Sequence, residues 1–239
     1  MFILWKVKRV LQLSWCLLLL PLVPPSGYAS DMVITNRKQR FCETFDTLEG
    51  TFESLPAGFA VSKDGSNCLS AADSGDFKAP HAGGTSEGAC RPWDLGDGNL
   101  ALGYQPTSAE FTPGFFMVSI SNATGEAVGL VEVAYQVVCY NNENRSSSLD
   151  LEYSRDGSAF TRIPSVSYSS PMREENPAHW AVTARSTAIH LRKPLAARGR
   201  FWLRWYADDN GGSGSRDEYG IDNVTITLRS RRGLVITIE

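Results

Sequence analysis

Carboxylates gather at both ends of the chain that follows residue 29. Glu43 and Asp46 lie in the segment 41–46, and Asp222 closes a run of acids near the other end. Oxygen ligands in loop-rich segments suit Ca²⁺, which accepts loose geometry and backbone carbonyls. If the first and last strands pair, we expect a structural calcium site there; the alternative is that all are solvated loop acids. The other acids of the run are Asp208, Asp209, Asp217 and Glu218.

A second group of residues has side chains suited to ligand binding. Trp202, Arg204 and Tyr206 occupy alternate positions of a predicted strand, so they project from one face of a sheet. Exposed planar rings stack on sugar rings, and amphipathic aromatic residues favour binding surfaces. We therefore predict a ligand-binding face at these three residues. The alternative is that the long polar segment 63–98 covers this face.

No residue is predicted to be catalytic. The sequence has no Gly-x-Ser-x-Gly motif, and its three histidines are not placed beside a nucleophile: His81, His179 and His190. Glycoside hydrolysis needs two carboxylates at a defined separation, which a sequence does not give. A lyase could in principle pair Tyr206 with Arg204. A secreted polysaccharide hydrolase or lyase on a jelly-roll fold is thus the alternative to a binding module.

Four cysteines follow the first 29 residues, and an even number in an exported chain allows two disulfides. Of the three pairings we favour Cys68 with Cys90, because both lie in one long polar loop, and then Cys42 with Cys139. Cys139 also lies on the apolar face of its strand, where it could serve as a small buried residue. No Cys-x-x-Cys motif or Cys/His cluster indicates zinc.

Residues 1–29 have the layout of a cleavable secretory signal peptide. Lys6, Lys8 and Arg9 precede an apolar run over 10–23, and the small residues Gly27 and Ala29 predict cleavage after Ala29. The apolar run is shorter than the roughly 20 residues that span a bilayer. We expect a secreted, extracellular protein with no membrane span in the mature chain.

Removal of this segment changes the charge balance. It carries three of the 23 Lys and Arg residues and none of the 26 acids, which leaves 20 basic and 26 acidic residues and a net charge of −6. No run of Lys or Arg is long enough to follow a phosphate backbone, so we expect no nucleic-acid partner. Residues 30–239 suit one large β domain.

Period-two alternation of apolar residues dominates the mature chain. One face of the segment 131–139 carries Val131, Val133, Tyr135, Val137 and Cys139, and segments 116–120, 149–153, 201–206 and 224–228 alternate similarly. Asp156-Gly157 predicts a hairpin turn. The pattern predicts an all-β, antiparallel jelly-roll (concanavalin-like) β-sandwich with one long loop at about 63–98.

Four pieces of sequence occur in an order that is similar to a known group. They are Phe-Cys-Glu-Thr-Phe-Asp at 41–46 followed by 55–59, the Tyr-Ser-Arg-Asp-Gly hairpin within 151–160, the strand 201–206, and the segment 219–224. Together they resemble the MAM and cleaved-adhesin-like jelly-roll modules of secreted and cell-surface proteins. The resemblance implies a structural calcium ion held by the opening acid, Glu43 or Asp46, and by the closing Asp222.

These observations predict a secreted, non-catalytic binding or adhesion module, with glycan or a cell-surface partner as its ligand. A structural component of an extracellular matrix or surface layer is a third class. Fold alone does not decide among them.

Overall fold

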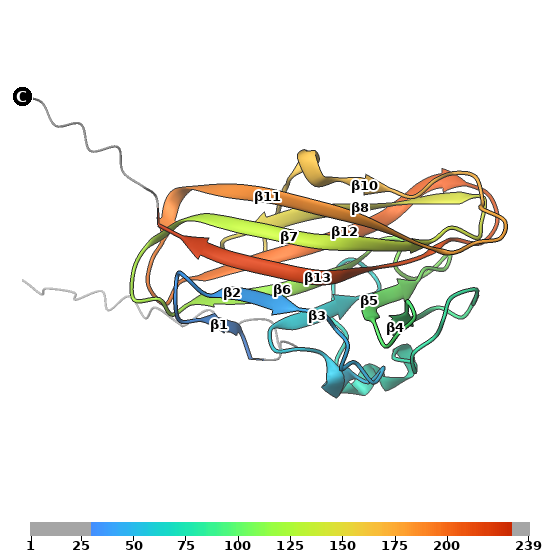
Figure 1. Ribbon diagram of the computed structural model, residues 1–239, viewed down its shortest axis with the longest axis horizontal. Coiled ribbons are helices and arrows are strands. Elements are labelled where there is room, and N and C mark those ends of the chain that lie inside the picture. The colour runs from blue at the N-terminus through green and yellow to red at the C-terminus, as the bar shows by residue number, and fades with distance from the viewer. Residues whose placement is uncertain (1–29, 231–239) are drawn as a thin grey trace, which may run out of the picture.

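The computed structural model describes residues 30–230, so the predicted signal peptide lies outside the described residues. Two β-sheets pack face to face over these residues, and their strands run along the length of the molecule (Figure 1). The predicted all-β jelly-roll sandwich is thereby confirmed. All strand pairs are antiparallel except β1 with β6.

The first sheet has seven strands. Its main path is β1 (Met32–Ile34), β6 (Gly114–Asn122), β12 (Arg200–Gly212), β8 (Arg145–Ser154) and β10 (Tyr168–Ser169). Two further strands pair at its margins: β3 (Phe59–Ser62) with β6 and β9 (Thr161–Arg162) with β8. The predicted hairpin at Asp156-Gly157 is confirmed, because it joins β8 to β9.

The second sheet has six strands, of which β11, β7 and β13 lie side by side in Figure 1. The main path is β11 (Trp180–Leu195), β7 (Val128–Tyr140), β13 (Glu218–Arg229), β5 (Leu100–Gln105) and β4 (Ala89–Asp94), and β2 (Arg40–Glu43) also pairs with β13. Glu43 of β2 lies opposite Val224 of β13. An early strand and the last strand therefore pair, as expected.

Within the described part of the chain, the helical content consists of three short 3-10 segments: η1 (Phe52–Ser54), η2 (Ala71–Asp76) and η3 (Pro164–Val166). Over residues 30–230 we find no helix long and apolar enough to cross a membrane. The segment predicted as a loop over about 63–98 differs from that prediction, because it contains η2 and the strand β4.

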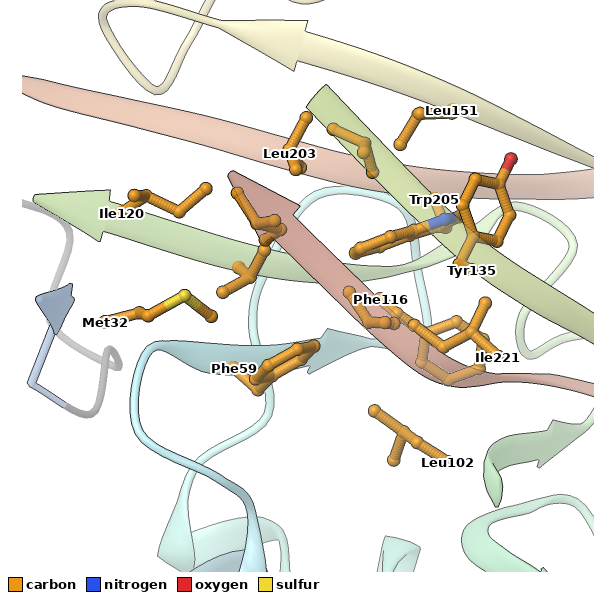
Figure 2. Close-up of a cluster of buried hydrophobic side chains, with 14 of the residues drawn as sticks. Met32, Phe59, Leu102, Phe116, Ile120, Tyr135, Leu151, Leu203, Trp205 and Ile221 are labelled. Atoms are coloured by element: carbon orange, nitrogen blue, oxygen red, sulfur yellow. The ribbon is translucent and has the colours of Figure 1, made fainter. Parts of the chain in front are cut away.

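The core lies between the sheets and follows the predicted alternation. Phe201, Leu203 and Trp205 of β12 are fully buried, as are the inward residues of β6. Figure 2 shows Trp205 and Phe116 from the first sheet close to Tyr135 and Ile221 from the second. The Tyr135 ring meets the Trp205 ring edge to face at 5.5 Å. Each such buried side chain contributes roughly 1.5–3 kcal/mol of hydrophobic stabilisation.

The Trp93 side chain of β4, the edge strand beyond β5, covers one end of the outer surface of the second sheet. Trp93 of β4 is fully buried, and its Nε1 donates a hydrogen bond to the Tyr219 carbonyl at 3.1 Å. Its ring lies so close to Gly103 that a β-carbon there would come within 1.9 Å of it. The β4 part of the long segment thus lies in the second sheet, whereas Gly65 near its start lies beside Tyr206, where a β-carbon would be 3.5 Å from the Tyr206 hydroxyl.

Neither predicted disulfide is present in the structure. Cys42 lies opposite Thr225 of β13 and Cys139 lies opposite Tyr219, so the two cysteines are about 20 Å apart along that strand. A disulfide needs Cα atoms within about 7 Å. Cys90 is a free, buried cysteine, so the Cys68–Cys90 bond is not formed.

Candidate functional site

The outer surface of the second sheet is hollowed along β7, and we call this hollow the sheet trough. Its central part has a volume of about 310 Å³ and its outer part about 950 Å³. The two parts adjoin, because Leu130 and Glu132 line the outer part while Ala134 and Gln136 line the central part of the same strand. The other lining residues are Asn36, Arg37, Lys38, Arg40, Tyr135, Ala184, Arg185, Ser186, His190, Asn223, Thr225, Arg229 and Ser230.

Small side chains form the floor of the sheet trough. Ala134 of β7 lies opposite Ser186 of β11, and Gln136 lies opposite Ala184. Neither pair carries a bulky apolar group, so the sheet surface stays low between the longer side chains around it. The Trp93 side chain, with Leu95 and Trp180 packed beside it, covers the neighbouring end of this sheet, where Val138 is fully buried. The trough is the part of this surface that remains open.

Planar polar groups are fixed at the centre of the sheet trough. Asn223 has a left-handed backbone conformation (φ 49°) at a register shift in β13, which turns its side chain toward β7. Its Nδ2 donates to Gln136 Oε1 at 3.0 Å and to Asp222 Oδ2 at 2.8 Å. From β2, Arg40 Nη2 donates to Thr225 Oγ1 at 3.4 Å. Two amides and one guanidinium are therefore held beside a floor of small residues.

The outer part of the sheet trough is rich in positive charge. Two of its arginines have carboxylate partners: Arg229 with Glu132 at 3.0 Å, and Arg37 with Glu126 at 2.7 Å. All four of these side chains are a third or more exposed. Solvent-exposed pairs of this kind contribute only about 0–1 kcal/mol.

The structure brings Trp202, Arg204 and Tyr206 together on the outer face of the first sheet, as the alternation predicted. Arg204 Nε donates to Glu152 Oε2 at 2.8 Å. The guanidinium also lies 3.8 Å from the centroid of the Phe160 ring and 4.9 Å from that of Tyr206. Arg204 is thus already held between an acid and aromatic rings.

The β8–β9 hairpin covers part of the Trp202 face. A β-carbon at Gly157 would lie 3.2 Å from the Trp202 ring, and Phe160 from the same hairpin lies over Arg204. Trp202 and Tyr206 are half-buried, and burial raises the pKa of the Tyr206 hydroxyl. This face is a flat, partly covered platform, whereas the sheet trough is an open hollow.

Two of the three predicted calcium ligands lie near each other. Asp222 is fully buried, and its pKa is raised to about 6, mainly by burial and further by the charge of Asp46. Asp46 is exposed and accepts a hydrogen bond from the Leu100 N–H at 3.0 Å.

The third predicted ligand, Glu43, accepts a hydrogen bond at its Oε1 from the nearby Phe45 N–H at 2.8 Å. Between residues 30 and 230, no three His, Cys, Asp or Glu side chains are grouped to hold a metal. The residues that could supply oxygen ligands to calcium are therefore Asp46, Asp222 and the neighbouring Asn99. The Asn99 side chain forms a hydrogen bond with Asp222.

Two neighbouring acids are fully buried at the start of β13. Burial raises the pKa of Asp217 to about 6 and that of Glu218 to about 7. Asp217 Oδ1 accepts from the Glu143 N–H at 3.1 Å, and Glu218 Oε1 accepts from the Thr85 N–H at 2.7 Å. These carboxylates anchor two loops to the end of the sandwich and do not line the sheet trough.

Sequence reasoning did not identify the sheet trough. The sequence carries only a weak signal of this surface. In the segment 130–136 the outward positions alternate with apolar ones, and in the segment 184–188 the outward positions are Ala and Ser. Whether such a surface is covered depends on where the long segment 63–98 packs, and that is a tertiary feature.

No protein-family model matches this chain, and no curated protein matches it either. Several solved structures are similar in fold. The K1 cleaved adhesin domain of Lys-gingipain from Porphyromonas gingivalis W83 matches 80% of this chain and 99% of its own length, with a TM-score of 0.45 and 10% identity. A carbohydrate-binding module of family 28, described as specific for non-crystalline cellulose, matches 87% of this chain and 100% of its own length, with a TM-score of 0.39 and 13% identity.

A Clostridium thermocellum xylanase 10B structure, with CBM22-1 and GH10 modules and bound xylohexaose, matches 82% of this chain with a TM-score of 0.38 and 10% identity. The chain spans 29% of that xylanase structure and 21% of a bacteriophage CBA120 tailspike protein that it also matches. These matches describe a similarity of fold, and their low identities and TM-scores carry no inference about ligand.

Proposed function

We propose that this protein is an exported, non-catalytic binding module that holds a glycan in the sheet trough. The observation that carries this proposal is the open hollow over β7, in which two amides and a guanidinium stand beside a floor of Ala, Ser and Thr. Recognition sites of this kind combine concave shape with a few fixed polar groups.

The chemistry of the sheet trough suits sugar hydroxyls. A hydroxyl both donates and accepts hydrogen bonds, an amide offers both functions, and a guanidinium offers fixed donors. Gln136, Asn223 and Arg40 therefore form a complementary set. The trough follows β7 from residue 130 to 136, which is about 20 Å at the usual rise per residue, long enough for several sugar units in a row.

The composition of the sheet trough favours binding over hydrolysis. A glycosidase of the common type places two carboxyl groups about 5 to 10 Å apart across the scissile bond. Among the described residues that line the trough, Glu132 supplies the one carboxylate, and Arg229 is its partner.

A structural calcium ion is part of the proposal. Asp222 is buried beside Asp46, and no arginine or lysine contributes to the shift in its pKa. A buried carboxylate without a cationic partner is costly, and a bound cation would remove that cost. Asp222, Asp46 and Asn99 would supply oxygen ligands, and the ion would link the segment after β2 to β13.

The Trp202 face supports a second ligand-binding surface. Trp202, Tyr206 and Phe160 are each half-buried, so part of each ring faces solvent. A flat aromatic surface can stack on sugar rings or on a partner protein. Because Arg204 is engaged by Glu152, the rings rather than the guanidinium would make that contact.

The test of the proposed function is to block the sheet trough without disturbing the core. Ala184 is an exposed residue of β11 on the floor of the trough, so Ala184→Trp fills the central hollow. We expect wild-type protein to bind members of a glycan array and Ala184→Trp to lose that binding. Ala72→Trp, at an exposed alanine of η2, is the matched control and should bind like wild type. Equal binding by Ala184→Trp and wild type would contradict a site in the trough.

A further inference from the structure

The sheet trough is basic although the chain as a whole is acidic. Its described lining has one carboxylate, Glu132, against four Lys and Arg residues, which are Arg37, Lys38, Arg40 and Arg229. The guanidinium of a fifth lining residue, Arg185, lies instead 5.7 Å from the centroid of the Tyr168 ring of the first sheet. The full sequence carries a net charge of −3. A local reversal of charge in a concave surface concentrates ligands of the opposite sign.

Two of these cations are available to a ligand. Over residues 30–230, Lys38 and Arg40 have no carboxylate within ion-pair distance, and both are exposed. Arg40 makes one long hydrogen bond, 3.4 Å, to the Thr225 hydroxyl. The carboxylate partners of Arg37 and Arg229 are solvent-exposed, so a ligand anion can replace them at small cost.

The positions of the cations fit an extended anionic chain rather than one small anion. Arg40 lies at the central part of the sheet trough, while Lys38, Arg37 and Arg229 line the outer part. Charges spaced along a trough can each meet one acidic group of a polymer, whereas a single phosphate or sulfate ion would meet one or two of them. Guanidinium groups bind carboxylate and sulfate oxygens with paired, charge-assisted hydrogen bonds.

We propose that the ligand of the sheet trough is an acidic polysaccharide, whose carboxylate or sulfate groups bind Lys38, Arg40, Arg37 and Arg229. This inference rests on the proposed glycan-binding function and narrows its ligand class. The amides of Gln136 and Asn223 then bind hydroxyls of the same chain, while the basic side chains select for its charge.

The test compares polysaccharides that differ only in charge. Isothermal titration calorimetry uses polygalacturonate and its fully methyl-esterified form, and chondroitin sulfate and its desulfated form, at low and physiological ionic strength. We expect at least one charged member to bind about tenfold more tightly than its matched form at low ionic strength, with the preference shrinking as salt rises. The pair that shows the preference distinguishes carboxylate from sulfate recognition.

Variants test whether the preference for the charged polysaccharide arises in the sheet trough. Lys38→Gln/Arg40→Gln should bring the affinity ratio of charged to matched polymer close to one. Arg173→Gln, which removes an exposed arginine from the segment before β11, should keep the wild-type ratio. Equal binding of charged and matched forms would overturn this inference and leave the glycan-binding function standing. A preference that survives in Lys38→Gln/Arg40→Gln would overturn its assignment to the trough. No binding of any of the four polymers would overturn the acidic-polysaccharide inference, and the glycan array then decides separately whether the glycan-binding function stands.

Discussion

Asn223 Nδ2 donates a hydrogen bond to Gln136 Oε1 at 3.0 Å, which joins the two central strands of the second sheet across the sheet trough. Asn223 can point this way because it occupies the left-handed region, with φ 49°, at the register shift of β13. Asparagine tolerates that conformation better than most residues.

This relationship predicts the effect of two substitutions at one position. Asn223→Ala removes the hydrogen bond and adds backbone strain, so we expect it to lower the free energy of unfolding by about 1–2 kcal/mol and to weaken glycan binding. Asn223→Gly relieves the backbone and should recover much of that stability while binding stays weak. Denaturant unfolding and calorimetry of both variants separate the two effects. If Asn223→Gly bound like wild type, the amide would have no role in recognition.

The buried acids at the start of β13 predict a pH dependence of stability. Glu218 has its pKa raised to about 7, so the folded state holds its proton at a pH at which the unfolded chain releases it. Ionisation therefore costs stability as pH rises from about 5 to above 7. We expect the Tm to fall over this interval in wild type, measured by thermal denaturation at a series of pH values.

Glu218→Gln keeps an acceptor for the Thr85 N–H but cannot ionise. It should flatten the fall in Tm and stabilise the protein at pH 8, by a free energy on the order of 3 kcal/mol. The exposed Glu49→Gln is the matched control and should keep the wild-type slope. An unchanged slope in Glu218→Gln would show that this carboxyl does not govern the transition.

The pair Asp46 and Asp222 predicts a response to calcium. Added Ca²⁺ should raise the Tm of wild-type protein, and EDTA should reverse the rise, because a ligand that binds the folded state stabilises it by mass action. Asp222→Asn should abolish the response while also removing the buried charge, and Glu53→Gln, at an exposed acid of η1, should leave it intact. A Tm that is insensitive to Ca²⁺ and EDTA would contradict the site.

On the Trp202 face, substitutions at two residues should separate an effect on stability from an effect on ligand binding. Arg204→Ala leaves the Glu152 carboxylate, which is largely shielded from solvent, without its partner and removes contacts to the Phe160 and Tyr206 rings. We expect a loss of about 2 kcal/mol in the free energy of unfolding. Trp202→Ala should cost less stability and should weaken binding only if this face carries a ligand. A stable Arg204→Ala protein would show that the guanidinium is not a structural element.

The sandwich could be predicted from sequence because its strands are amphipathic with period two. The inward residues of β7 and β12 were identified from alternation alone, and so was the shared face of Trp202, Arg204 and Tyr206. The β8–β9 hairpin followed from Asp156-Gly157. Each of these features is local, so the pattern of a few residues determines it.

The features that sequence reasoning missed depend on register and on long-range packing. The Cys42–Cys139 pairing fails because the two residues face different positions of β13, and no local pattern reports that register. Burial of Asp217 and Glu218 depends on the loops that carry Glu143 and Thr85. The sheet trough is open because Trp93 packs at one end of the second sheet, a contact between residues far apart in sequence.

Binding of a glycan in the sheet trough is tested most directly by amide chemical-shift mapping. The NMR spectrum of the labelled protein is followed during titration with an oligosaccharide that it binds. We expect shifts at Ala134, Gln136, Ser186, Asn223 and Thr225, with the amides of Trp202 and Tyr206 unaffected at the concentrations that fill the trough. Shifts that cluster on β12 and the β8–β9 hairpin instead, with the outward residues of β7 unchanged, would contradict it.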